Sequence, residues 1–373
     1  MAGMAQPAHT LNPSASVASA VQALAAQAID QAGGWLPFDR FMALALYAPG
    51  LGYYANGSRK FGWMPGSGSD FVTAPEMSPL FGRCLAVQVA QVLQVTGTDM
   101  VFEFGAGSGA LAEQLLSTLG QALQRYCIVE LSAELRARQQ MRLACFGDKV
   151  QWLDTLPEAI EGVVVANELL DAVPVQLLHW DGSGWFERGV ALADGALAWA
   201  DRPTALRPPV PGPFVPGTVT EIHPQAQALV RTVAAALQRG MLLIVDYGFP
   251  EAEYYHPQRL GGTLMCHRAH RADADPLQDP GDKDITAHVD FTGIALAAQD
   301  AGLTVAGYTS QARFLLNCGL AGLLETASLA ERTMAHRLVA EHEMGELFKV
   351  IALTRDCPVD PLGFAAGDRT HRL

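Results

Sequence analysis

A glycine-rich turn is the first place in this 373-residue sequence where residue types and spacing indicate chemistry. A short β-prone run leads into it and a helix-prone run follows. Glycines let the backbone approach a ligand closely and adopt positive φ, and the first turn of a helix offers free N–H groups. The spacing also satisfies the dinucleotide pattern, so by itself it indicates a nucleoside ligand without saying which one. The residues expected at this ligand are Glu103, Gly105, Ala106, Gly107 and Gly109.

Two carboxylates near this turn favour a cationic ligand. Glu103 would repel a pyrophosphate but suits a molecule that carries an ammonium and a sulfonium. Glu130 ends the next predicted strand, followed by Leu131, and a carboxylate there accepts hydrogen bonds from both ribose hydroxyls. We therefore predict that S-adenosylmethionine is the cofactor, that Glu130 and Leu131 contact it, and that the protein is a methyltransferase. An NAD-dependent oxidoreductase is the alternative, because dinucleotide enzymes also place an acid where Glu130 stands.

A polar cluster follows the apolar strand predicted at 162–167. It contains Asn167, Glu168 and Asp171. Ligands of open α/β sheets bind at the carboxyl ends of the strands, so these side chains should lie above the cofactor. A carboxylate pairs bidentately with the planar fork of a guanidinium. We predict that Glu168 and Asp171 orient or deprotonate the methyl acceptor and that Asn167 contacts the cofactor. Capping of a helix by Asn167, with an acid in its first turn, is the structural alternative.

Two further residues are candidates for catalysis. Asp246 ends the fifth predicted strand, and we predict that it helps Glu168 and Asp171 to orient or deprotonate the acceptor, with capping of the next turn as the alternative. His288 could accept a proton at neutral pH or be structural. The string Cys266, His267 and His270 has no second cluster beside it, so we predict no metal site.

The elements that must position these residues alternate between strand and helix. Several of the strands are apolar on both faces, which is typical of a parallel sheet covered by helices. The predicted fold is therefore α/β with a Rossmann-like sheet. The strands are expected at 100–104, 125–130, 150–153, 162–167 and 241–246.

Composition shifts divide the chain. Turn pairs at 181–182 and 194–195 indicate antiparallel strands in an inserted, substrate-facing subdomain. Residues 1–16 lack the basic and apolar features of targeting segments and are expected to be a disordered leader. The predicted parts are a leader at 1–16, a helical N-terminal lid at 17–97, a cofactor-binding core at 98–174 and 221–355, an insert at 175–220, and a tail at 356–373.

Charge and cysteine content exclude some classes of function. A net charge of −13 argues against nucleic acid as a partner, because phosphate binding needs basic stripes. No apolar run reaches the ~18 residues of a membrane span, so no membrane insertion is expected. The six scattered cysteines form no CxxC pair, from which we predict a reducing, cytoplasmic location.

Seven segments, in one order along the chain, resemble the MidA-like methyltransferase family, whose mitochondrial members include a complex I assembly factor that methylates arginine. The resemblance covers about 38–309. Ser69 stands where the family usually has glycine, after an entrance loop at 63–69 that is longer than usual. The resembling segments are 51–54, 70–82, 103–109, 129–130, 166–174, 245–248 and 284–291.

This resemblance implies a class I methyltransferase sheet with the N-terminal helices closing over the cofactor. It implies that Thr73 and Pro75 border the cofactor or substrate site. The reaction it implies is protein arginine N-methylation, with a complex I subunit as the substrate of the mitochondrial members. A non-catalytic assembly chaperone that keeps the fold for cofactor binding alone is a second alternative, although the intact carboxylate cluster argues against it. A homodimer is a further expectation.

Overall fold

The computed structural model describes residues 17–56, 73–130, 132–268 and 271–373. The predicted leader at 1–16, the entrance loop at 63–69, Leu131 and His270 lie outside the described residues. Within these ranges we find no helix with both the length and the apolar character that a membrane crossing requires.

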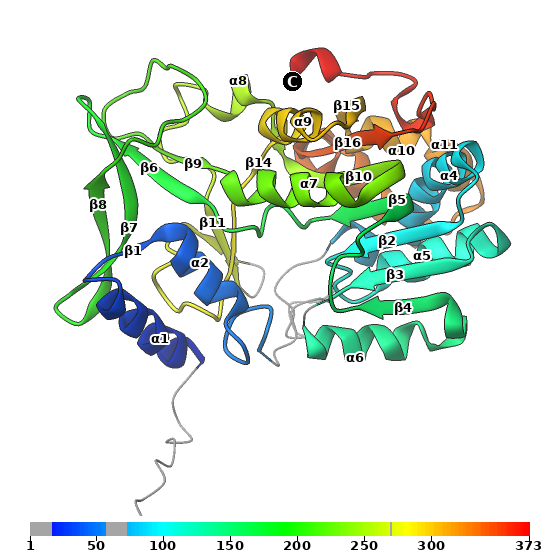
Figure 1. Ribbon diagram of the computed structural model, residues 1–373. Helices are drawn as coiled ribbons and strands as arrows, with labels where there is room; N and C mark the ends of the chain where they lie inside the picture. Colours follow the sequence, from blue (N-terminus) through cyan, green and yellow to red (C-terminus); the bar gives the residue numbers. More distant parts are fainter. Residues whose placement is uncertain (1–16, 57–72, 131, 269–270) are drawn as a thin grey trace, which may run out of the picture.

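The largest sheet in the described chain has eight strands, in the order β15-β16-β10-β5-β2-β3-β4 with β14 paired to β10 (Figure 1). β4, β3, β2, β5 and β10 are parallel, and near one edge β16 pairs antiparallel with both β10 and β15. The fold class predicted from the sequence is confirmed. The strands are β2 (Met100–Phe104), β3 (Arg125–Val129), β4 (Val150–Leu153), β5 (Ile160–Asn167), β10 (Leu237–Phe249), β14 (Val289–Asp290), β15 (Thr304–Ser310) and β16 (Phe348–Arg355).

Helices cover both faces of this sheet. β5 shows why, because Val163 and Val165 belong to one apolar core and Val164 to the other. Alternate side chains of a strand point to opposite faces, so a continuous apolar run needs a helix layer on each side. The layers contain α4 (Pro79–Thr96), α5 (Ala110–Leu119), α10 (Gln311–Asn317) and α12 (Leu329–Val339) on one face, and α7 (Pro224–Ala236) and α9 (Phe291–Asp300) on the other.

The strand order reverses beside β2. The chain passes from β2 to β3 on one side, whereas β5 pairs with β2 on the other, so that Phe104 lies opposite Ala166. In open α/β sheets such a reversal leaves a crevice at the carboxyl ends of the strands, where ligands bind. The predicted glycine turn and polar cluster therefore begin side by side.

A second lobe is built on an antiparallel sheet in the order β1-β7-β6-β9, with β8 paired to β7, and a third sheet has the order β12-β11-β13. In Figure 1 this lobe lies to the left of the parallel sheet, with α1 and α2 against it. Its elements are α1 (Val17–Gln31), β1 (Leu36–Pro37), α2 (Phe38–Tyr47), β6 (Gln176–Trp180), β7 (Trp185–Ala193), β8 (Ala196–Pro203), β9 (Val219–Ile222), β11 (Met265–Arg268), β12 (Arg271–Asp273) and β13 (Asp284–Thr286).

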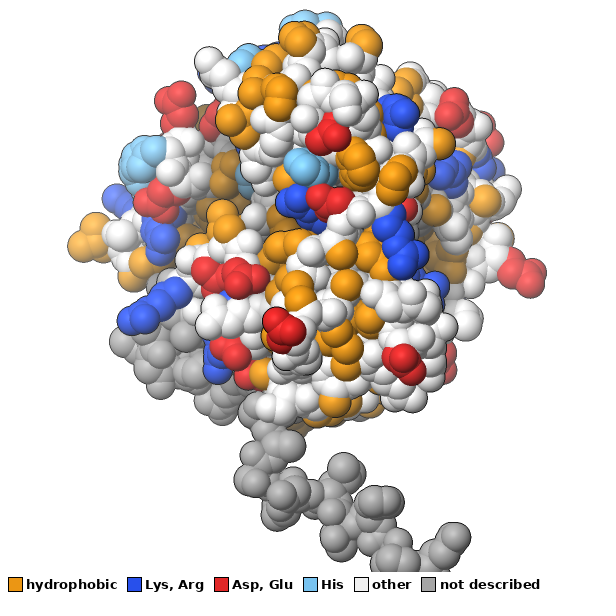
Figure 2. Space-filling model, turned by 90° about the vertical axis from the view of Figure 1, so that its left-hand side faces the viewer, with side chains coloured by type: hydrophobic (Ala, Val, Ile, Leu, Met, Phe, Trp, Pro, Cys, Tyr) orange, Lys and Arg blue, Asp and Glu red, His pale blue; other side chains and the backbone are white. Residues whose placement is uncertain are grey.

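The outer face of this lobe is chemically mixed. Figure 2 shows Lys and Arg side chains scattered among acidic and hydrophobic ones on it. Leu192 of β7 and Trp199 of β8 are partly exposed. This is not the basic stripe that binding to a phosphate backbone requires.

The helices predicted as one N-terminal lid are divided between the two lobes. α1 and α2 share an apolar core with Leu177 and Val190 of the antiparallel sheet, whereas α4 packs on the parallel sheet. The helical region that begins at Leu320 is interrupted, because Ser328 forms a capping box with Glu331 and starts a new helix. The remaining helical segments are α3 (Ala74–Met77), α6 (Ala133–Arg142), α8 (Glu251–Tyr254), α11 (Leu320–Thr326) and short turns at 120–122, 144–149, 341–345, 362–364 and 370–372.

Candidate active site

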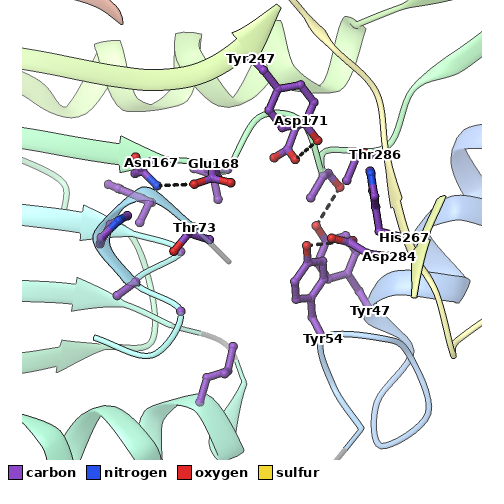
Figure 3. A pocket seen from close by; sticks show the side chains of 18 of the residues that line it. Tyr47, Tyr54, Thr73, Asn167, Glu168, Asp171, Tyr247, His267, Asp284 and Thr286 are labelled. Atoms are coloured by element: carbon purple, nitrogen blue, oxygen red, sulfur yellow. Dashed lines mark hydrogen bonds between the residues drawn. The ribbon is translucent and has the colours of Figure 1, made fainter. Parts of the chain in front are cut away.

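A cavity of about 1010 Å³ lies between the two lobes (Figure 3). Phe104, Val129 and Asn167, at the carboxyl ends of β2, β3 and β5, line one side. Tyr54 and Asp284, from the antiparallel lobe, line the other. The cavity therefore lies at the reversal of strand order, where the fold leaves room for a ligand.

The glycine turn, residues 103–109, forms one end of this cavity. Gly105, Gly107 and Gly109 have φ of +66°, +52° and +81°, which residues with a side chain rarely adopt. A Cβ atom on Gly105 would lie 2.9 Å from Leu169 Cδ1. Gly105, Ala106 and Gly107 line the cavity. Gly109 does not line the cavity. It precedes the first turn of α5, where a Cβ atom would lie 3.5 Å from Gln139, so its role is to allow the conformation of the turn.

Glu103 is buried in the wall of the cavity, beside the glycine turn. Tyr126 Oη donates a hydrogen bond to its Oε2 at 2.7 Å. Burial raises the pKa of Glu103 to about 7, and the bond from Tyr126 partly offsets that rise. A cation placed against Glu103 would favour its ionised form.

Glu130 lies in the cavity wall at the end of β3. Its Oε1 accepts from Ser132 N at 2.8 Å and its Oε2 from Gln139 Nε2 at 3.0 Å. Gln139 Nε2 also donates to Gly107 O at 2.9 Å, which fixes Glu130 relative to the glycine turn. Gln139 was not predicted from the sequence, although a fully buried amide on the polar helix α6 is the kind of residue that bridges such groups.

Glu168 is held in the left-handed region, at φ +49°. Its N–H donates to Val245 O at 2.9 Å, and its Oε1 accepts from Asn167 Nδ2 at 3.2 Å and from Ala74 N at 3.3 Å. Burial, and then the nearby Asp171, raise the pKa of Glu168 to about 8. A non-glycine residue in this region costs roughly 1–2 kcal/mol, and such residues cluster at functional sites.

Thr73 and Pro75 also line the cavity. The bond from Ala74 N to Glu168 brings this segment against the end of β5. The family resemblance implied that Thr73 and Pro75 border the site, whereas neither composition nor periodicity indicated this.

Asp171 and Asp246 take different positions. Tyr247 Oη donates to Asp171 Oδ2 at 2.5 Å, while the buried Oδ1 of Asp171 has no hydrogen-bond partner among the described residues. Burial raises the pKa of Asp171 to about 6. Asp246 does not line the cavity. Its Oδ2 instead accepts from Leu169 N and Leu170 N, at 3.2 and 2.8 Å, as well as from Asp171 N. In place of the predicted contact with the acceptor, Asp246 caps the turn that carries Glu168 and Asp171.

Two tyrosines and an aspartate form the opposite wall, as Figure 3 shows. The rings of Tyr47 and Tyr54 stack with centroids 5.7 Å apart. Tyr54 Oη donates to Asp284 Oδ1 at 2.9 Å, and Tyr47 Oη donates to Ala172 O at 2.8 Å. Sequence reasoning did not place Tyr54 or Asp284 in the site, because 230 residues separate them and no local spacing links them.

His288 lines the cavity next to Tyr247. The two rings meet edge to face, 5.1 Å apart, and the buried Nδ1 of His288 has no partner among the described residues. Burial lowers the pKa of His288 to about 4, so the imidazole is neutral at pH 7. In the described part of the chain no group of three or more potential ligands is placed to hold a metal ion.

Comparison with known proteins identifies the family. Residues 84–309 match the family Methyltransf_28, described as "Putative S-adenosyl-L-methionine-dependent methyltransferase". The chain belongs to this family of methyltransferases. A Burkholderia thailandensis protein of the COG1565 superfamily, solved with S-adenosylhomocysteine bound, is 49% identical to this methyltransferase over 98% of this chain and 99% of that one, with a TM-score of 0.93. A native structure of a COG1565 superfamily protein from that organism gives 48% identity and a TM-score of 0.89 over the same shares.

Animal relatives are more distant but also match along most of their length. A Caenorhabditis elegans protein named protein arginine methyltransferase NDUFAF7 homolog, mitochondrial, is 26% identical over 90% of this chain and 88% of its own. The Mus musculus protein named protein arginine methyltransferase NDUFAF7, mitochondrial, is 28% identical over 86% and 81%. These findings confirm the predicted methyltransferase activity and S-adenosylmethionine as cofactor, so the oxidoreductase alternative is set aside.

The predicted cytoplasmic location is contradicted, because these relatives are named as mitochondrial proteins. The inference from cysteines failed for a physical reason. Unpaired thiols show only that an environment is reducing, which does not single out the cytoplasm.

The cavity of the methyltransferase fits a cationic methyl donor. Asn167 lines the cavity, and its Oδ1 is a buried acceptor with no partner among the described residues. Glu103 and Glu130 add carboxyl groups at the glycine end. The ammonium of a cationic methyl donor can donate to this acceptor, and its sulfonium is attracted by the carboxylates, whereas a pyrophosphate would leave the acceptor unpaired and bring like charges together.

Proposed function

We propose that this methyltransferase transfers a methyl group to an arginine side chain of a protein. The observation that carries the proposal is the acid group, by which we mean Glu168, Asp171 and Asp284. These three carboxyl groups line the cavity together with the hydroxyl groups of Tyr54 and Tyr247. A guanidinium offers five N–H donors in a plane and pairs well with several carboxylates at once. The names of the animal relatives support the same acceptor.

At the glycine end, we propose that the backbone of Gly105, Ala106 and Gly107 approaches the cofactor and that Glu130 holds its ribose hydroxyls. Glu103 and Asn167 would accept from its ammonium. Leu131, Thr73 and Pro75 are proposed to border it. When bound, S-adenosylmethionine supplies an electrophilic methyl group on a sulfonium.

The acid group lies at the other end of the cavity, which we call the acid end. There the carboxylates of Glu168 and Asp171 would pair with the guanidinium of the acceptor arginine and fix one of its nitrogens in line with the methyl group of the cofactor. Alignment of this kind supplies much of the rate in a displacement reaction. Glu168 would accept the proton that this nitrogen loses, because it lies in the wall and its pKa of about 8 is close to the working pH. Asp284, held by Tyr54, would orient the far side of the guanidinium. We propose no direct chemical role for Asp246.

The test is methyl transfer to protein. Purified enzyme, S-adenosylmethionine with a labelled methyl group and a protein extract should give methylarginine in peptides analysed by mass spectrometry. We expect Glu168→Gln to lower the signal by about a hundredfold and Glu161→Gln, an exposed acid at the other end of β5, to leave it unchanged. If S-adenosylhomocysteine binds but no protein is methylated, the chaperone alternative is favoured. Label on lysine or a carboxyl group would contradict the proposal.

The acceptor that we propose, on the resemblance described above, is a subunit of respiratory complex I. Enrichment of complex I from the extract should then concentrate the labelled peptides. That the protein forms a homodimer stays a prediction, and sedimentation velocity of the purified protein measures its oligomeric state.

A further inference from the structure

Arg259 has no acidic partner in the cavity. It lines the wall beyond the end of β10, with its guanidinium carbon 4.5 Å from the centroid of the Phe249 ring. Its Nε is buried without an acceptor, and Nη2 has only a long 3.5 Å contact with Glu253 O. Within the described residues no carboxylate lies within ion-pair distance of it. A buried guanidinium N–H left unpaired is costly, which indicates that a ligand supplies the acceptor.

His288 contacts the same aromatic ring as Arg259. Its imidazole is 5.1 Å from the Phe249 ring, and its Nδ1 is also buried without a partner in the described chain. A neutral imidazole can donate from Nδ1 in one of its tautomers. Arg259 and His288 both line the cavity, and each carries a buried nitrogen without a partner among the described residues. We call this part of the cavity wall the anion subsite.

The anion subsite adjoins the acid group through one side chain. The ring of Tyr247 contacts His288, and its hydroxyl bonds to Asp171. The glycine end is farther away, because Phe249 ends β10 and β5 lies between β10 and β2. At a strand spacing of about 4.8 Å, the strand that ends in Phe249 lies roughly 10 Å across the sheet from the strand that leads into the glycine turn.

We propose that Arg259 and His288 bind a carboxylate of the acceptor polypeptide, next to the arginine that is methylated. This inference rests on the proposed function. The acceptor would be recognised by a pair of opposite charges, with its guanidinium against the acid group and its carboxylate against the anion subsite. The other carboxylate that could reach the cavity is that of the methionine part of the cofactor, and the experiment separates the two.

The test follows the Nε–H resonance of Arg259 in protein with ¹⁵N-labelled arginine and S-adenosylhomocysteine bound. The resonance is assigned by its loss in Arg259→Lys, with Arg268→Lys as the matched control, because Arg268 is an exposed arginine already paired with Asp279. We expect N-acetylglycine, at up to tens of millimolar, to shift this resonance and N-acetylglycinamide, which lacks the carboxylate, to leave it in place. No shift with N-acetylglycine would overturn the proposal. A large shift of the Arg259 resonance on adding S-adenosylhomocysteine alone would also overturn the proposal, because the cofactor would then occupy the anion subsite.

A second measurement joins both charges in one probe. N-acetylarginine should bind the S-adenosylhomocysteine complex about tenfold more tightly than N-acetylargininamide, as expected for one charge-assisted pair, and Arg259→Gln should remove the difference. Equal binding of the two compounds to the unaltered protein would count against the subsite. If neither compound binds, the arginine acceptor itself is in error, while the resonance shift with N-acetylglycine still decides the anion subsite.

Discussion

The two ends of the cavity are built in different ways. The glycine end comes from the carboxyl ends of β2 and β3, which are neighbours in the sheet and close in the sequence. The acid end combines the turn after β5 with Tyr54 and Asp284 from the other lobe. One end is therefore fixed within a single sheet, and the other depends on how two lobes pack.

This difference separates what the two ends can do. A cofactor common to many enzymes can be held by backbone and strand ends that any such sheet provides. An acceptor specific to this enzyme needs groups that the common sheet does not supply, and the antiparallel lobe brings them. Changes at the glycine end should therefore alter cofactor affinity, and changes at the acid end should alter transfer while cofactor affinity is kept.

The largest effect is expected from Gly105→Val. The change forces a branched side chain into φ +66° and places its Cβ 2.9 Å from Leu169 Cδ1, where the cofactor must also approach. Affinity for S-adenosylhomocysteine in calorimetry should fall by about a thousandfold or more, because the backbone approach is blocked. Gly97→Val is the matched control, since Gly97 has φ +67° with nothing within 4 Å of its Cβ position. Equal loss of affinity in both variants would mean that backbone strain, and not the turn, is responsible.

Glu168→Gln should separate the two ends most clearly. The amide keeps the shape of the side chain but cannot ionise, so the rate of methyl transfer should fall by about a hundredfold. Affinity for S-adenosylhomocysteine should stay within a few-fold of the unaltered enzyme. A fall in cofactor affinity as large as the fall in rate would place Glu168 at the cofactor instead of the acceptor.

The rate should also depend on pH through the acid end. Burial raises the pKa of Glu168 to about 8 and that of Asp171 to about 6, so near pH 6 Glu168 is largely protonated and cannot pair with a guanidinium. The rate at saturating cofactor should rise by up to about tenfold per pH unit from pH 6 and level off above about pH 8. In Glu168→Gln the residual rate should lose this rise. Because these pKa values are raised in the folded state, the protonated forms of Glu168 and Asp171 stabilise the fold, and this stability is lost as the pH rises through those pKa values. Thermal unfolding between pH 6 and pH 8 measures the loss.

Glu130→Gln tests the ribose contact at the glycine end. Loss of the charge should weaken binding of S-adenosylhomocysteine by about tenfold, because hydrogen bonds to a charged partner become neutral ones. Glu134→Gln, on the next helix and paired with Arg138, is the control and should bind normally. Unchanged affinity in Glu130→Gln would remove the residue from the proposed cofactor site.

The sequence predicted the glycine end better than the acid end. Glu103, Gly105 and Glu130 are recognisable because strand, turn and carboxylate follow one another locally. Asp246 was assigned to the acceptor because it ends a strand, but hydrogen bonds from the turn at 169–171 direct its carboxylate away from the cavity. Tyr54 meets Asp284 because α2 packs against β13, and no spacing in the sequence indicates that packing.

The smallest effects should come from a matched pair of tyrosines, one at each end. Tyr54→Phe removes the hydroxyl that bonds to Asp284, and Tyr126→Phe removes the one that bonds to Glu103. Each variant loses one hydrogen bond to an acid and keeps its ring, so each should weaken binding of one ligand by roughly three- to tenfold. For Tyr54→Phe the loss should appear in the KM of the acceptor, and for Tyr126→Phe in the Kd of S-adenosylhomocysteine. If both variants changed the same constant, the two ends of the cavity would not act separately, and the assignment of the cofactor to one end and the acceptor to the other would be wrong.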